Sequence, residues 1–336
     1  MCIFLNGAGI MILIYVDDLL IAGKSKNDCQ TTADQLAQHF EIRAMGDVYE
    51  YLGIRIFRNR EKRQIFMTQE AYATKILHKF GMQNLKPAAQ PWKSDLTIPS
   101  TWTVHSDEQK SYIKQTGSLN YLSAGSRPDI TQTINKLREA NAGPSKQHLE
   151  ALKHLWRYLS GCPALDIVLG GKYNPRDLQL HVFADASFAS ELGTRLSIGG
   201  QVVFLAGAPI YWKSKKHSLV FMRSTESEFC DLTLAGIPAL SIAKLLRELG
   251  FHQSLPVVMF TDSLNAKATV LNPLNTARTR HIDTQYKWIT DPTSKGYSKL
   301  EHVRTTSMVA DGLTKPLLKE GHQNFVRMLC LQMRLW

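Results

Sequence analysis

The first strongly apolar stretch of the chain, residues 10–23, is interrupted by two adjacent acids, Asp17 and Asp18. Its two arms are rich in Ile, Leu and Val, which is typical of buried β-strands. Two such arms around a short polar turn predict a β-hairpin with both carboxylates at its tip. Because an unpaired carboxylate is costly to bury, the tip is either a solvated turn or a divalent-cation site.

Hydrophobic periodicity predicts further elements in the first half of the chain. Apolar residues near helical spacing predict a helix over 28–40, with Asn27 as its N-cap. A turn at 46–47 and the alternation after it predict one strand over 48–56. The remaining predicted elements are a strand over 64–68 that closes a hairpin across 59–62, a helix over 68–80 stopped by Gly81, an extended connection over 86–103, a helix starting near Pro128 and an amphipathic helix over 147–160.

In the second half, from 178 to 313, predicted strands and helices alternate, which favours an α/β layer fold. A long helix is expected over 226–249, and a short strand over 219–222 is an open alternative. The other predicted strands cover residues 178–184, 197–205, 209–213, 257–260 and 300–303.

Four acids occupy related places in this pattern. Asp185 and Asp262 each follow a predicted strand, Glu228 lies on the long helix, and Asp311 follows the last strand. Acids after strands are often solvated caps, but convergent carboxylates can also hold two divalent cations ~4 Å apart for a displacement at phosphorus. The order strand-Asp, helix-Glu, strand-Asp and later Asp favours the second interpretation.

Composition narrows the class of protein. The chain has 336 residues, 44% of them apolar and 21% charged, and a formal net charge of +11. The length is enough for two or more globular domains. The positive net charge favours a polyanionic partner. The five scattered cysteines have no metal-ligand spacing, which indicates reduced thiols in an intracellular protein. The N-terminus lacks the basic region of a signal peptide, and no acid-free apolar run is long enough to span a bilayer.

Several strings in the first half resemble the reverse transcriptases of copia-type retrotransposons. The string Tyr15-Val16-Asp17-Asp18 is similar to the catalytic hairpin of the palm subdomain, so the resemblance implies that Asp17 and Asp18 are catalytic metal ligands. Reverse transcriptases also need a third palm Asp on an upstream strand, and no acid precedes Asp17. The other similar strings are residues 51–54 (YLGI), 67–72 (MTQEAY) and 127–130 (RPDI).

The second half resembles the ribonuclease H domain of the same polyprotein. The strings that carry this resemblance are residues 183–186 (FADA), 224–229 (STESEF), 260–263 (FTDS) and 309–316 (VADGLTKP). Ribonuclease H families place the catalytic Glu immediately before an apolar helix residue, which favours Glu228 over Glu226; Glu226 is interpreted as helix N-terminal charge. The residues implied to be catalytic and to hold the metal ions are Asp185, Glu228, Asp262 and Asp311.

Two basic strings are candidates for contacts with the phosphates of a hybrid duplex. The first is a predicted loop before the long helix, and a purely solvated loop is an equally good interpretation of it. The second resembles another copia-type signature and ends at His281, which we interpret as structural rather than catalytic. The candidate nucleic-acid-binding residues are Lys213, Lys215, Lys216, Arg278 and Arg280.

Together these features predict the C-terminal part of a retrotransposon Pol polyprotein. The expected fold class is α/β, with a partial α+β palm and a helical thumb and connection, followed by a ribonuclease H-like mixed-sheet α/β domain. The expected units are residues 1–82 (palm and thumb entry), 83–175 (thumb and connection), 176–316 (ribonuclease H-like domain) and 317–336 (C-terminal tail).

The resemblance implies a ribonuclease H that cleaves the RNA strand of RNA–DNA hybrids with Mg²⁺ or Mn²⁺, two ions per active site, and with no small-molecule cofactor. Because the fingers and the third palm Asp are absent, DNA polymerase activity is not expected from this chain alone. The expected partners are the hybrid, primer-template nucleic acid and the upstream remainder of the polyprotein, without a membrane. The expected location is intracellular, in cytoplasmic virus-like particles or the nucleus. The alternative is an inert remnant that only binds nucleic acid.

Overall fold

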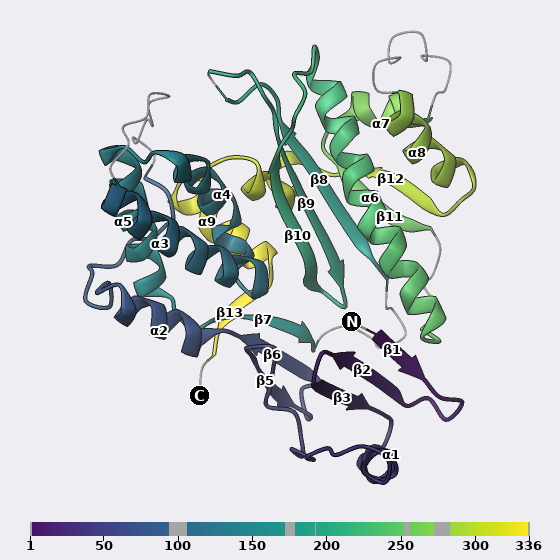
Figure 1. Ribbon diagram of the computed structural model, residues 1–336. Helices are drawn as coiled ribbons and strands as arrows, with labels where there is room; N and C mark the ends of the chain where they lie inside the picture. The colour runs from purple at the N-terminus through teal and green to yellow at the C-terminus, as the bar shows by residue number, and fades with distance from the viewer. Residues whose placement is uncertain are drawn as a thin grey trace.

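Three β-sheets and the helices between them organise the chain (Figure 1). The computed structural model describes residues 2–93, 106–171, 179–191, 193–251, 256–271 and 283–334. A small N-terminal sheet is followed by a second sheet, a helical unit and a mixed α/β sheet. The predicted fold class, an α+β first part followed by a mixed-sheet α/β domain, is confirmed.

The N-terminal sheet carries the Asp17-Asp18 hairpin. Tyr15 pairs with Asp18, so Val16 and Asp17 form a two-residue turn, and Val16 has the left-handed backbone that such turns require, with φ 53°. The predicted hairpin is therefore confirmed. Its strands, in the order β1-β2-β3, are β1 (Cys2–Leu5), β2 (Met11–Tyr15) and β3 (Asp18–Ala22).

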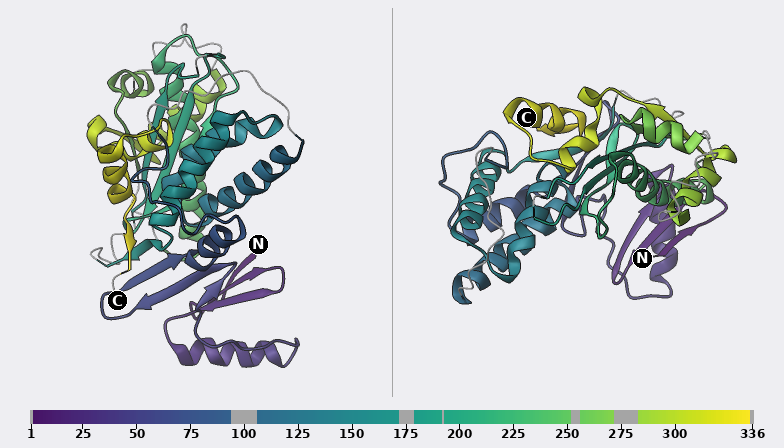
Figure 2. Two further views of the ribbon diagram at one scale, coloured as in Figure 1. Left: turned by 90° about the vertical axis from the view of Figure 1, so that its left-hand side faces the viewer. Right: turned by 90° about the horizontal axis from the view of Figure 1, so that it is seen from above.

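The predicted burial of the hairpin strands is wrong. Among residues 2–67, Ile10 is the one buried residue, whereas Phe4 and Tyr15 are exposed and Val16 is 80% exposed. An apolar run predicts a strand that is covered on both faces. Here the sheet lies at the periphery of the molecule, away from the helical unit (Figures 1 and 2).

Helix α1 (Lys26–Ala37) follows this sheet and has no buried residue. It begins earlier than predicted because Ser25, not Asn27, is its N-cap. The Ser25 hydroxyl accepts a hydrogen bond from Asp28 N–H at 3.1 Å, which satisfies one of the free donors of the first turn.

The second sheet is antiparallel and combines residues from distant parts of the chain. The single strand predicted over 48–56 is wrong, because Leu52 and Gly53, with φ 52° and 73°, turn the backbone into a hairpin. The predicted hairpin across 59–62 is confirmed. The strand over 165–170, which pairs with the strand over 64–68, was not predicted. The C-terminal edge strand over 331–333 was not predicted either. In the order β13-β7-β6-β5-β4, the strands are β4 (Glu50–Tyr51), β5 (Ile54–Asn59), β6 (Gln64–Thr68), β7 (Leu165–Gly170) and β13 (Leu331–Met333).

The helical unit has a core of its own. Ile76 and Leu77 of the first helix pack with Leu119, Ile134 and Trp156 of the others, so this core crosses the expected boundary at 82/83. The extended connection expected over 86–103 lies partly outside the described residues. The helices are α2 (Glu70–Lys79), α3 (Ser106–Gly125), α4 (Thr131–Arg138) and α5 (Lys146–Gly161), with 3₁₀ turns η1 (Pro128–Ile130) and η2 (Glu139–Ala142).

A buried polar network ties this unit to the C-terminal helix. Arg127 donates two hydrogen bonds to Asp129, at 2.8 and 2.7 Å, and the Tyr158 hydroxyl donates to the same carboxylate at 2.8 Å. His322 Nε2 lies 2.9 Å from the Tyr158 oxygen. Burial lowers the pKa of His322 to about 4, so its ring is neutral at pH 7.

The third sheet is mixed and holds the acids predicted for the second half. Strands β8, β9 and β10 are antiparallel, whereas β11 runs parallel to both β8 and β12. The strand considered for 219–222 does not form; this segment is irregular, and three of its four side chains are exposed. In the order β10-β9-β8-β11-β12, the strands are β8 (His181–Ser187), β9 (Ile198–Leu205), β10 (Ala208–Lys216), β11 (Val257–Thr261) and β12 (Ser298–His302).

Helix α6 (Ser224–Glu248) covers one face of this sheet, beside α7 (Leu264–Leu271) and α8 (Asp283–Ser294) (Figure 1). Phe229 and Leu232 of α6 share a core with Val182 and Met259 of the strands. By length and composition α6 could cross a membrane, with mean hydropathy 1.5 over its most apolar window. Of that window 44% is buried, and its buried residues pack against β8 and β11.

The C-terminal region packs against the face of the third sheet that is opposite to α6. It consists of the 3₁₀ turns η5 (Thr305–Ser307) and η6 (Val309–Leu313) and helix α9 (Lys319–Met328), followed by β13. Leu313 and Phe325 share a core with Ile167 of β7 and Val202 of β9. Within residues 317–334, β13 therefore belongs to the second sheet, and α9 packs against strands of both five-stranded sheets.

Candidate metal centre

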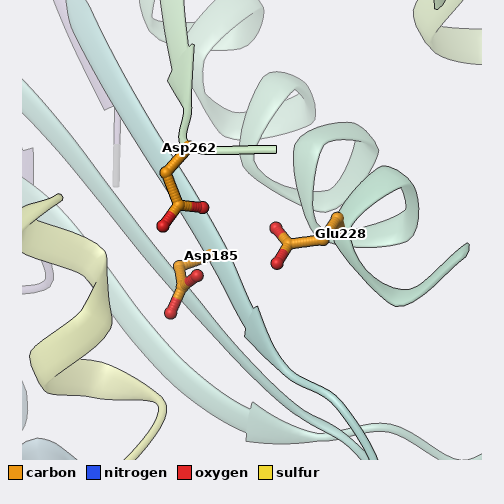
Figure 3. A group of neighbouring side chains, drawn as sticks. All are labelled: Asp185, Glu228 and Asp262. Carbon is orange, nitrogen blue, oxygen red and sulfur yellow. The ribbon is translucent and has the colours of Figure 1, made fainter. Parts of the chain in front are cut away.

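Three of the predicted acids converge at the centre of the third sheet (Figure 3). Asp185 lies inside the central strand β8, not after it as predicted, and is 5% exposed. Asp262 directly follows the neighbouring parallel strand β11, and Glu228 comes from the second turn of α6. One carboxylate oxygen from each of the three lies within 4.8 Å of the others.

The electrostatics of this cluster favour a bound cation. Burial, followed by the charges of Asp311 and Asp262, raises the pKa of Asp185 to about 7. Burial, followed by Asp185 and Asp262, raises the pKa of Glu228 to about 9. Glu228 Oε2 is buried and has no hydrogen-bond partner among the described residues. Three oxygen donors with one unsatisfied atom suit a hard divalent cation.

Two threonine hydroxyls fix the orientation of these carboxylates, and sequence reasoning missed both. Thr314 Oγ1 donates to Asp185 Oδ2 at 2.8 Å, and Thr305 Oγ1 donates to Asp262 Oδ2 at 2.8 Å. Thr314 is 1% exposed and lies in the VADGLTKP string that drew attention to Asp311. Nothing in the sequence around Thr305 indicates its role, because the contact spans 43 residues.

The fourth predicted acid, Asp311, is close to the cluster but engaged elsewhere. It lies in η6, and its Oδ1 is 2.6 Å from Lys315 Nζ. Its charge contributes to the raised pKa of Asp185. The structure thus brings Asp185, Glu228 and Asp262 together and leaves Asp311 beside them in an ion pair.

Glu226 and Asp231 flank Glu228 on α6 and have structural contacts. Glu226 Oε2 accepts the N–H of Met222 at 3.0 Å, at the start of the helix, as expected for helix N-terminal charge. Asp231 is buried, and its Oδ2 lies 2.9 Å from His217 Nε2. This buried pair, which sequence reasoning missed, anchors the segment before α6.

The polymerase-like acids are in a different environment. Asp17 and Asp18 are both exposed at the tip of the N-terminal hairpin. Among the described residues, Asp185, Glu228 and Asp262 are the one group of acids that converges as metal ligands do, so no third acid joins the hairpin pair there.

The candidate nucleic-acid-binding residues differ in their exposure and in their ion pairs. Lys213 and Lys215 are exposed on β10, which replaces the predicted loop with a strand. Lys216 is paired with Glu139 at 2.5 Å and with Glu191 at 3.2 Å, and its role in phosphate binding stays a prediction. Arg278, Arg280 and His281 lie outside the described residues.

Comparisons with known proteins identify the family of the chain. A family model described as reverse transcriptase (RNA-dependent DNA polymerase) matches residues 1–94. The retrovirus-related Pol polyprotein from transposon TNT 1-94 of Nicotiana tabacum is 32% identical over 91% of the chain, and that from transposon RE2 of Arabidopsis thaliana is 34% identical over 95%. The two relatives place the protein in the class of retrovirus-related Pol polyproteins. More narrowly, the chain belongs to the Pol polyprotein family of copia-type retrotransposons.

The chain spans about a fifth of those relatives, 23% and 21% of their respective lengths. An uncharacterized mitochondrial protein of Arabidopsis thaliana is 31% identical over 66% of the chain and 90% of that protein. Among solved structures, LC11-RNase H1 in complex with an RNA/DNA hybrid covers 40% of the chain and 94% of its own, with a TM-score of 0.32 and 11% identity.

Proposed function

We propose that the third sheet and its C-terminal elements form a ribonuclease H that cleaves the RNA strand of an RNA–DNA hybrid. The observation that carries the proposal is the convergence of Asp185, Glu228 and Asp262, from two strands and one helix, within 4.8 Å. Membership of a reverse-transcribing family supports this substrate, because copying RNA into DNA produces such hybrids.

The residues present fit Mg²⁺ or Mn²⁺. Asp185, Glu228 and Asp262 would hold the ion through carboxylate oxygens, and the unpartnered Glu228 Oε2 would gain a ligand bond. When bound, a divalent cation at such a site lowers the pKa of a coordinated water and stabilises the leaving oxygen. Thr314 and Thr305 keep two of the carboxylates in one orientation. Two ions per site, as expected from the family, would also require Asp311.

Hybrid selectivity would depend on duplex shape more than on base sequence. An A-like duplex displays its 2′-hydroxyls in a wide, shallow minor groove and offers side chains little base readout. Lys213 and Lys215, two positions apart on β10, point to the same side of the sheet and could each meet a phosphate.

The test is cleavage of a hybrid labelled on its RNA strand, in Mg²⁺. We expect Asp185→Asn, Glu228→Gln and Asp262→Asn each to lower the rate by at least ~100-fold, because each keeps the shape of the side chain and removes the charge that holds the cation. Glu226→Gln is the matched control on the same helix and should change the rate little. If none of the three variants affects cleavage, the activity belongs to a contaminant, and the inert nucleic-acid-binding remnant is the better account.

We propose further that the partner of the N-terminal sheet is the upstream part of the Pol polyprotein. Phe4, Tyr15 and Val16 are exposed on this sheet, and large exposed apolar surfaces mark interaction sites. The same partner would supply the third carboxylate that Asp17 and Asp18 need for polymerisation. Primer extension by this chain alone is therefore not expected, and extension that is abolished by Asp17→Asn would contradict the proposal.

A further inference from the structure

The acid cluster has two unlike sides. On one side, Asp185, Glu228 and Asp262 face one another, and the remaining oxygen of Glu228 is without a partner among the described residues. On the other side, Asp311 Oδ1 is 2.6 Å from the ammonium of Lys315. The side of the cluster next to Asp311 is therefore already occupied by a positive charge, that of Lys315.

The backbone between these two residues is held firmly. Asp311 O accepts a hydrogen bond from Lys315 N at 3.3 Å, and Thr314 Oγ1 lies 3.0 Å from the same oxygen, so its one proton is shared between Asp311 O and Asp185. The same Thr314 hydroxyl lies 2.8 Å from Asp185, which links the turn to the cluster. A Cβ at Gly312 would come within 2.5 Å of the Phe325 ring, so the turn is packed directly on α9.

Lys315 also acts on the acids across the cluster. Its side chain is half-exposed, and its charge lowers the pKa of Asp185, opposing the effects of burial and of Asp311. The ion pair with Asp311, together with the charges of Asp185 and Asp262, in turn raises the pKa of Lys315 above its ordinary value. The lysine is therefore charged at neutral pH.

We propose that Lys315 takes the place of a second divalent cation, so that the free protein binds one such ion, at Asp185, Glu228 and Asp262. This inference rests on the proposed ribonuclease H function and deepens it. A divalent ion bound to Asp311 would meet the ammonium group at close range, and like charges this close repel strongly in a partly buried site. Either the lysine leaves or the second ion is bound weakly.

The test is titration of the full chain with Mn²⁺ by isothermal calorimetry. We expect the wild type to bind one equivalent tightly. Lys315→Met keeps most of the side chain and removes its charge, and should reveal a second equivalent or tighten it at least ~10-fold. Lys315→Arg keeps the charge and should bind one equivalent, as the wild type does.

Lys319→Met is the matched control, since it removes one exposed lysine four positions further along the chain and should leave the titration unchanged. Tight binding of two equivalents by the wild type, or an unchanged titration in Lys315→Met, overturns the inference while the triad site stands. If the wild type binds no Mn²⁺, or Asp185→Asn binds it equally well, the metal site of the proposed function itself fails. Thermal melting of each variant checks the fold, and Lys315→Gln replaces Lys315→Met should the latter unfold.

Discussion

The chemistry of single residues is clearest at Asp185 and Glu228, two of the three acids that converge as candidate metal ligands. Burial and mutual repulsion raise the pKa of both groups, to about 7 and about 9. Such a site has unfavourable interactions between its carboxylates, which either protonation or a bound cation relieves. It therefore costs the protein stability when no cation is bound.

Because repulsion between the acids destabilises the fold, we expect removal of one of these charges to stabilise it. In EDTA, Asp185→Asn should melt above the wild type, because it removes one of the repelling charges. Adding Mg²⁺ should raise the melting temperature of the wild type and have little effect on the variant, since an ion stabilises only the state that binds it. Equal stabilisation of both proteins by Mg²⁺ would show that the ion binds elsewhere.

A second prediction at this scale concerns pH. The pKa of His322 is lowered by burial from 6.5 to about 4, so the unfolded chain takes up a proton first as pH falls. Its contribution to the free energy of unfolding is complete above pH 6.5 and is lost between there and pH 4. The full loss is about 3 kcal/mol. Denaturant titrations across this window should show a shallower decline for His322→Gln, and identical slopes would contradict the assignment.

Single residues also show how far the sequence could predict the site. Asp185 and Asp262 were found because an Asp near the end of an apolar strand is visible in the sequence, and Glu228 was found through the family resemblance. Three of the four predicted acids do converge. Thr305 and Lys315 were missed because their partners are set by packing: the turn that carries Lys315 is placed by the contact of Gly312 with Phe325. No local pattern of apolar and polar residues encodes that contact.

At the scale of elements, periodicity predicted long helices and paired strands better than edges. Helix α5 and strand β6 lie within a residue of their predicted ranges, because each buries one regular face. Strands β7 and β13 escaped prediction. The second has three residues, and its pairing partner lies more than 160 positions earlier in the chain.

Strand β13 is fixed by the residue that follows it. Arg334 pairs with the fully buried Asp166 and with Glu70, and its guanidinium lies 4.0 Å from the centre of the Phe57 ring. Arg334→Met should lower the free energy of unfolding by about 3 kcal/mol, because it leaves a buried carboxylate without its counter-ion. In Asp166→Asn/Arg334→Met, much of that loss should be recovered. A double variant as unstable as the single one would mean that packing against Phe57, not charge, is what matters.

At the scale of the molecule, stability is distributed unevenly. Residues 2–67 contain one buried residue, Ile10, whereas the third sheet and the helical unit each have an extensive core. Backbone amides of β2 and β3 should therefore exchange with deuterium at least ~100-fold faster than those of β8 and β9. Mass spectrometry of exchanged peptides measures this directly. Equal protection in both sheets would rule out an independently unstable N-terminal part, and protection on adding the upstream polyprotein segment would identify its partner.

The net charge of +11 belongs to the same scale. We expect salt-sensitive binding to nucleic acid, with Lys213→Gln/Lys215→Gln reducing the slope of log affinity against log salt by about 1–2. Lys244→Gln/Lys295→Gln removes the same charge from two exposed positions and is the control. Binding that is flat between low and moderate salt, or equal effects of the two pairs, would exclude β10 as the contact surface.

The pairing of β7 with β13 has a consequence for how this polypeptide can be divided. The two strands lie side by side, yet all five strands of the third sheet come between them in the chain. In topological terms the unit built on the third sheet is an insert, because the strands that precede and follow it, β7 and β13, pair with each other in the second sheet. A single proteolytic cut at 175/176 would therefore release no self-sufficient module. Separating the two fragments would take β13 away from β7, its strand partner, and expose the edge of β7 that β13 covers. Separating the two units cleanly therefore requires two cuts, one on each side of the insert.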